Sequence, residues 1–175
     1  MKRIGIDPDN KFIGCAILEN NELTINKYKI PEFIYEIIPS WEIEYSDLCA
    51  NHKYGEMKIY LEGGWLNPYY YHSTENSMII NNIARKIGMN HQVGIMIDEI
   101  LTYKRIKYET VKPVQYSKYK PQKEKINHNQ LMKMINDYGI KFTAERSNQD
   151  ERDSALLLLF YEYELKKPVE EYTFF

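Results

Sequence analysis

The segment that most constrains the fold is residues 2–30, which has the pattern of three short strands joined by tight polar turns. Apolar residues fill or alternate through 2–7, 12–18 and 22–30, and the turns between them read "PDNK" and "ENN". Strands separated by so few residues pair with their neighbours in antiparallel fashion. We therefore expect the chain to begin with a three-strand antiparallel meander.

The remaining pattern predicts a mixed α/β protein, in a single domain that spans residues 1–175. Helical crossovers between strands require parallel pairing, with the first strand in the middle of the sheet. Residues 31–56 indicate loops with one short helix. The other expected elements are a strand at 57–62, helices at 76–87 and from Asn90 to Leu101, a strand at 106–111, and helices at 127–138 and from Ser147 or Asn148 to Leu165.

Acidic residues stand at the ends of two of these strands. Asp7 closes the first strand and Glu62 closes the fourth, so both project from one sheet edge if the two strands are parallel neighbours. Asp150 and Asp153 stand three residues apart near the start of the last helix and share one face of it. Simpler interpretations exist for each acid: a turn residue for Asp7, an exposed strand end for Glu62, and a favourable helix dipole for the other two.

Together, however, these acids favour a metal-dependent phosphodiesterase. Four carboxylates in one cleft would repel each other strongly without cations to neutralise them. Oxygen ligands favour Mg²⁺ or Mn²⁺, and the four histidines show no shared spacing that would predict a zinc site. Two ions would suit an in-line displacement at phosphorus, in which one activates water and the other stabilises the leaving oxygen.

Charge is segregated along the chain in a way that suggests a phosphate-binding face. Segment 102–125 holds eight basic residues against two acidic ones, a local charge of +6, which leaves −8 elsewhere in a chain of net charge −2. The alternative is a solvated, disordered basic loop. The basic candidates for DNA binding are Lys104, Arg105, Lys107, Lys112, Lys118, Lys120, Lys123 and Lys125.

Aromatic residues follow Glu62 in a predicted loop. Trp65 and Tyr69 are candidates for stacking on unpaired bases beside a nuclease site. The alternative for Trp65 is that it covers the hydrophobic core, and the sequence does not separate the two interpretations.

Three stretches, "RIGIDPDNKFIGCAIL", "IYLEGGW" and "NQDERDSALLLL", together resemble the three acidic motifs of RuvC-type Holliday-junction resolvases, in the ribonuclease H-like superfamily. The resemblance extends over roughly residues 2–20, 57–113 and 125–165, in order and spacing. It implies a ribonuclease H-like α/β fold whose five-stranded mixed sheet, three antiparallel strands followed by two parallel ones, is flanked by helices.

The same resemblance implies roles for particular residues. Asp7, Glu62, Asp150 and Asp153 would be the catalytic acids that bind two Mg²⁺ or Mn²⁺ ions per site. Lys118 would lie near the scissile phosphate, with Lys120 or Lys125 as alternatives. The family acts as a homodimer, and the helix near 90–103 would form the dimer surface.

Departures from the family pattern point to a divergent branch, viral or phage-borne. The family usually has glycine after "DP", where this chain has Asp9, and "EGG" replaces the commoner residues after the glutamate. These differences concern the choice of substrate more than the chemistry.

The expected function is a structure-selective endonuclease that resolves four-way DNA junctions. Alternatives are a ribonuclease H-type enzyme acting on RNA–DNA hybrids and a non-catalytic protein that binds branched DNA. We expect a cytoplasmic location, in the host cytoplasm if the protein is viral, and no membrane role. The N-terminus reads as a strand, the longest apolar run (155–160) is short, and the two cysteines form no disulfide framework.

Overall fold

The computed structural model describes residues 1–53, 55–66, 77–113 and 126–164. Within these ranges six strands form one mixed sheet in the order β5-β4-β1-β2-β3-β6. The strands β1, β2 and β3 are antiparallel, whereas β4 pairs in parallel with β1, β5 with β4, and β6 with β3. Their bounds are β1 Lys2–Pro8, β2 Phe12–Glu19, β3 Glu22–Lys29, β4 Met57–Glu62, β5 Glu109–Val111 and β6 Lys141–Phe142.

The predicted meander, the central position of β1 and the ribonuclease H-like arrangement are confirmed by this sheet. One strand exceeds the expected five, because Lys141 and Phe142 pair with Glu22 and Leu23 at the outer edge of β3. A two-residue strand carries too short a pattern to be recognised in the sequence.

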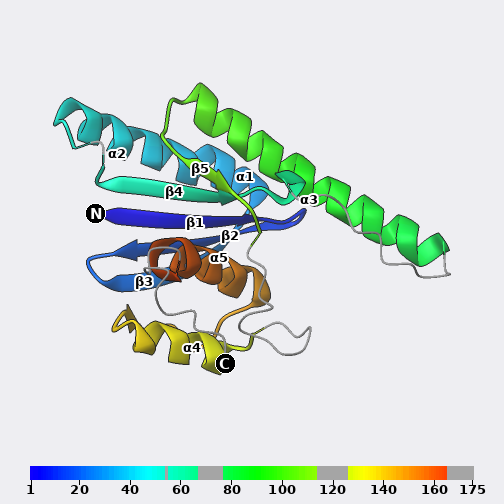
Figure 1. Cartoon of the computed structure of the whole chain (residues 1–175). Helices are drawn as coiled ribbons and strands as arrows, with labels where there is room; N and C mark the ends of the chain where they lie inside the picture. The colour runs from blue at the N-terminus through cyan, green and yellow to red at the C-terminus, as the bar shows by residue number, and fades with distance from the viewer. Residues whose placement is uncertain (54, 67–76, 114–125, 165–175) are drawn as a thin grey trace, which may run out of the picture.

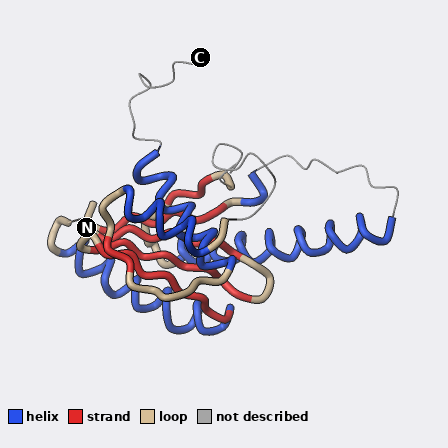
Figure 2. Tube along the Cα trace, turned by 90° about the horizontal axis from the view of Figure 1, so that it is seen from below, coloured by secondary structure: helices blue, strands red, loops and turns tan. Residues whose placement is uncertain are grey.

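Helices cover both faces of the sheet (Figure 1). On one face lie α2 (Ile38–Ala50) and α3 (Ser77–Tyr103), and on the other α4 (His128–Asp137) and α5 (Gln149–Leu159). Figure 2 shows the first part of α3 extending beyond the sheet. Among the described residues, none of the helices combines the length and apolar character needed to cross a membrane.

Side chains alternate between two cores, one on each face of the sheet. In the first core, Ile4, Ile6, Ile59 and Leu61 pack against Ile97 and Leu101 of α3 and against Trp41 of α2. In the second, Ala16, Leu18, Leu23 and Tyr60 pack against the leucine run 156–159 of α5 and against Leu131 and Ile135 of α4. The carboxylate of Glu162 is buried beside Tyr60 of the second core. It forms an ion pair with Arg3 at 2.5 Å and accepts a hydrogen bond from Tyr60.

The expectation of loops in 31–56 is wrong, because the structure is helical from Ile30 to Ala50. The helix α1 (Ile30–Glu32) leads into a π-helical turn, η1 (Phe33–Ile37), and then into α2. Pro31 falls in the first turn of α1, where proline's missing N–H removes no helical hydrogen bond, and Pro39 lies directly after the π-helical turn η1, at the start of α2. The two prolines are the reason why the sequence pattern favours loops in this segment.

The two helices expected around Gly88 are one continuous 27-residue helix, α3. Glycine inside a helix costs only about 1 kcal/mol relative to alanine, which neighbouring turns readily offset. The strand expected at 106–111 is shorter than predicted, since only Glu109–Val111 pairs with β4.

The starts of the last two helices are as predicted, whereas α5 ends at Leu159, before the predicted Leu165. Asn127 and Gln130 form a reciprocal capping box at the start of α4, and Gly139, with φ at +66°, follows its end. Asn148 and Glu151 form the same motif at the start of α5. After Leu159 the chain continues as the π-helical turn η4 (Phe160–Glu164).

One side of the helix near 90–103, which was expected to form the dimer surface, packs into the first core. Ile97 and Leu101 are fully buried there, and Val93 and Ile100 pack against it. The apolar residues that remain exposed on this part of α3 are Ile95 and Tyr103. The homodimer stays a prediction.

The two cysteines should differ sharply in reactivity. Cys15 lies in β2 with no exposed surface, and burial raises the pKa of its thiol to about 12. Only about one Cys15 thiol in ten thousand is therefore ionised at pH 8, and only the thiolate is nucleophilic. We expect a maleimide at pH 8 to label Cys49 alone in the folded protein and both cysteines in guanidinium, counted by mass spectrometry. A Cys49→Ser variant that still reacts when folded would contradict this.

Candidate active site

Asp7 and Glu62 lie side by side at the same edge of the sheet. The strands β1 and β4 run in parallel with Ile6 opposite Leu61, so the next residue of each strand is an acid. Both acids also point to the face covered by α5. A methyl group at Gly5 would lie 2.6 Å from the Ser154 carbonyl oxygen of α5, and Asp7, two residues later, has the same direction as Gly5.

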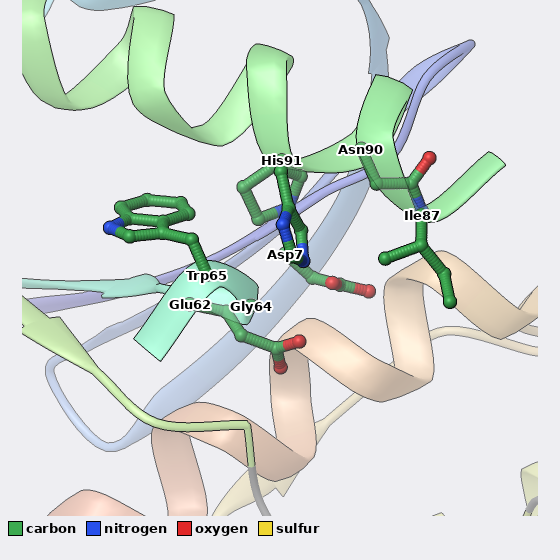
Figure 3. Close-up of a pocket in the computed structure, with 8 residues that line it drawn as sticks. Asp7, Glu62, Gly64, Trp65, Ile87, Asn90 and His91 are labelled. Atoms are coloured by element: carbon green, nitrogen blue, oxygen red, sulfur yellow. The ribbon is translucent and has the colours of Figure 1, made fainter. Parts of the chain in front are cut away.

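The two carboxylates share a cavity of about 160 Å³. Figure 3 shows both of them on the side of His91 that faces the α5 ribbon. The wall opposite the sheet comes from α3, and the floor from the short 3₁₀ turn η2 (Gly64–Leu66). The lining residues are Asp7, Pro8, Glu62, Gly64, Trp65, Ile87, Asn90 and His91.

The acidic start of α5 lies against β2, next to Asp7. Gly14 pairs with Asp7 across the β1–β2 ladder, and a methyl group on Gly14 would lie 2.2 Å from the backbone oxygen of Asp150. The absence of a side chain at Gly14 therefore allows the first turn of α5 to approach the site.

The side chains of this first turn have other contacts. Asp150 pairs with Lys27 of β3 at 2.9 Å, and Asp153 accepts a hydrogen bond from Gln149 at 2.5 Å. The carboxylate of Glu151 caps its own helix by accepting from the backbone N–H of Asn148. Hence the structure brings Asp7 and Glu62 into one cavity and pairs Asp150 with Lys27, while Asp153 has Gln149 among its partners.

We tested this arrangement against the two ions that the sequence predicts. Two carboxylates in one polar cavity fit a single hard divalent cation such as Mg²⁺ or Mn²⁺. In the parts of the chain that the structure describes, no three His, Cys, Asp or Glu side chains are grouped so as to hold a metal ion. The donor set therefore fits one ion at Asp7 and Glu62, and it does not fit a second ion at Asp150.

His91 is part of the cavity but was not predicted from the sequence. It lies on α3 one turn after Ile87, beside Asn90, and a methyl group at Gly64 would lie 3.0 Å from its Nε2 atom. Burial lowers the pKa of His91 below its ordinary value. The four histidines share no spacing with one another. Ile87 and His91 are four residues apart, and this helical spacing was the signal that could have placed them on one face.

Trp65 packs against the first core, as one of the two interpretations has it, and its stacking on unpaired bases stays a prediction. It also lines the cavity. A methyl group at Gly94 of α3 would lie 2.3 Å from Trp65 Cζ3, so glycine at this position makes room for the indole ring. Tyr69 lies outside the described residues.

The basic candidates are divided between two ends of the sheet. Lys104 forms an ion pair with Glu42 of α2, and Lys107 lines a separate cavity beside Met57, where β4 begins. Together with Arg105 they precede β5, at the end away from Glu62. Lys112 follows Val111, which pairs with Glu62, so it lies at the edge that carries the acids. Lys118, Lys120, Lys123 and Lys125 lie outside the described residues.

Tyr161 of η4 anchors the chain where it leaves β5. Its hydroxyl donates to the carbonyl oxygen of Lys112 at 3.0 Å. Burial, followed by the negative charges of Glu109 and Glu62, raises the pKa of Tyr161. The chain is therefore anchored at Lys112, at the edge of the sheet that carries Glu62.

The turn that follows Asp7 is fastened to α3 by Asn90. The Asn90 amide donates to Asp9 at 3.1 Å and accepts from the backbone N–H of Asn10 at 3.1 Å. Asp9, the residue that departs from the family pattern, also accepts from the backbone N–H of Lys11. Asn90 thus connects the β1–β2 hairpin to the helix on the other side of the cavity.

Removing this connection should destabilise the protein measurably. We expect Asn90→Ala to lower the free energy of unfolding by ~1–2 kcal/mol, because two partly buried hydrogen bonds are lost. Urea unfolding would measure the change. Asn82→Ala, at an exposed position of the same helix, controls for the higher helix propensity of alanine. Equal stability of the two variants would contradict the role of Asn90.

Comparison with known proteins gives structural neighbours alone, since no protein-family model and no curated protein match the sequence. One neighbour is RuvC of Thermus thermophilus in complex with a Holliday junction substrate. It shares 11% identity over 94% of this chain and 94% of that chain, with a TM-score of 0.44. A second Thermus thermophilus RuvC structure shares 14% identity over 91% and 92% of the two chains, with a TM-score of 0.38. Both belong to the family that the three acidic motifs resemble, but similarity at this level transfers no function, which has to come from the site.

Proposed function

We propose that this chain is a divalent-metal-dependent endonuclease that hydrolyses phosphodiester bonds in four-way DNA junctions. The observation that carries the proposal is the meeting of Asp7 and Glu62 in one cavity, beside the acidic first turn of α5. The two acids end adjacent parallel strands, so their carboxylates reach the same cavity. Oxygen ligands for a hard cation are a sufficient reason for such a pair.

Each part of the site has a role in this reaction. When bound, Mg²⁺ or Mn²⁺ lowers the pKa of a water molecule and stabilises the charge that develops on the phosphate. Asp7 and Glu62 would bind and orient the ion. Trp65 excludes water from one wall of the cavity, while Asn90 holds the turn after Asp7 in place. Lys112 adds positive charge at the same edge of the sheet.

Branched DNA is proposed as the substrate because of the motifs and the charge. The order and spacing of the three acidic motifs resemble those of junction resolvases, and Lys112, within the basic segment 102–125, lies at the sheet edge that carries the acids. Paired cuts in opposite strands of a junction need two active sites, so we propose that two copies of the chain act together.

The test is an incubation of the purified protein with Mg²⁺ or Mn²⁺ and a labelled synthetic four-way junction. Linear duplex DNA and an RNA–DNA hybrid serve as parallel substrates, and EDTA as the metal-free control. We expect paired nicks in opposite strands of the junction. Cleavage of the hybrid alone would replace the proposal with a ribonuclease H-type activity. Tight junction binding without cutting under either metal would indicate a non-catalytic DNA-binding protein.

A further inference from the structure

Lys27 lies in the same row of the sheet as the two acids of the cavity. Asp7 pairs with Gly14, and Gly14 pairs with Lys27, so the row continues from Glu62 on β4 through to β3. Leu23 and Ile25 of β3 pack in the core beneath α5, and Lys27 follows them with the same direction. A lysine therefore points to the α5 face at the level of the acids.

The ammonium group of Lys27 is held by two contacts. Its Nζ atom lies 2.9 Å from Asp150 Oδ2 and 4.0 Å from the centroid of the Phe12 ring, a cation–π contact. The side chains of Lys27 and Asp150 are 28% and 25% exposed. The pair Lys141–Glu22, at the other end of β3, has the same 2.9 Å separation but is 66% and 43% exposed. The Lys27–Asp150 pair is thus the more enclosed of these two ion pairs.

The contact between Lys27 and Asp150 explains why the site fits one ion where the sequence predicts two. A carboxylate near other carboxylates needs a positive charge beside it. For Asp7 and Glu62 that charge fits into their shared cavity as a divalent ion, whereas Asp150 already has the ammonium group of Lys27. The ammonium group of Lys27, fixed by Asp150 Oδ2 and the Phe12 ring, supplies that charge from within the chain.

We propose that Lys27 is a positioning residue that takes the place of a second divalent ion at Asp150, so that one ion, bound by Asp7 and Glu62, completes the site. This inference rests on the proposed metal-dependent function. It differs from the two-ion expectation because the positive charge next to Asp150 is part of the chain.

The experiment is a titration of the full chain with Mn²⁺ alone, in which electron paramagnetic resonance measures the free ion. We expect one Mn²⁺ per chain in the wild type. Lys27→Met keeps the aliphatic stem and frees Asp150, so its stoichiometry should rise to two. Lys27→Arg restores the charge and should return it to one. The double variant Lys27→Met/Asp150→Asn should also bind one ion, because the added ion needs Asp150. Lys141→Met is the matched control and should stay at one.

Several outcomes would overturn the inference. Two ions bound by the wild type would do so directly, and this measurement does not depend on any variant folding. A correctly folded Lys27→Met protein that still binds one ion would do so as well. Junction cleavage by a wild type that binds two ions would leave the proposed function intact and remove only the role of Lys27. The absence of Mn²⁺ binding in both the wild type and Asp7→Asn would remove the two together.

Discussion

Replacement of Asp7 by asparagine should abolish cleavage of a four-way junction while the protein remains folded. The amide fits the same space but has no negative charge to hold a divalent cation beside Glu62. Metal stabilisation of the transition state is worth several kcal/mol, and each 1.36 kcal/mol is a factor of ten in rate. We therefore expect the cleavage rate to fall roughly a thousandfold or more in single-turnover measurements with Mg²⁺.

Binding of the junction should respond in the opposite direction. Loss of a negative charge at the cavity removes repulsion toward the phosphates, so Asp7→Asn should bind the junction as tightly as the wild type or more tightly. Gel-shift titrations without divalent metal would measure this. Asp47→Asn, an exposed isosteric change on α2, is the control for the loss of one carboxylate. Cleavage that survives in Asp7→Asn would show that Asp7 is not a metal ligand.

The sequence was sufficient for the parts of the fold that depend on local patterns. The β1–β2–β3 meander follows from alternation and short turns, and the starts of α4 and α5 follow from the helical patterns that begin near Asn127 and Asn148. Parallel pairing with β1 in the middle of the sheet followed from the rule on helical crossovers. Each of these features is encoded by residues a few positions apart, or by a rule that covers all sheets.

Features that depend on distant contacts were beyond the reach of the sequence pattern. The acids at 7 and 62 could be assigned to one sheet edge, but His91 and Asn90 join their cavity only because α3 crosses the end of the sheet. The ion pair between Lys27 and Asp150 depends on how β3 is positioned relative to α5. Two acids three apart on a helix predict a shared face and do not say which neighbour each one meets.

Gly14→Ala is the variant expected to have the largest effect outside the acids. The added methyl group would lie 2.2 Å from the backbone oxygen of Asp150, and a backbone atom, unlike a flexible side chain, cannot turn away. Ordinary contact needs a separation of about 3.4 Å, so α5 has to move by about 1 Å. Strain of this kind in a packed region costs about 1–3 kcal/mol of unfolding free energy. Urea or thermal unfolding would measure it.

The same displacement should slow cleavage by more than the loss of stability explains. Misplacement of a site by about 1 Å can reduce a rate roughly a hundredfold, and Gly14→Ala moves the first turn of α5 away from Asp7 without changing any acid. Gly88→Ala is the matched control, because among the described residues no atom outside its own stretch of helix lies within 4 Å of the added methyl group, and alanine favours the helix. A Gly14→Ala protein that cuts junctions at the wild-type rate, at a temperature where it is fully folded, would show that the acidic turn of α5 takes no part in the reaction. A folded but slow variant would mean that catalysis depends on how closely α5 approaches β2, and therefore on a residue that carries no functional group at all.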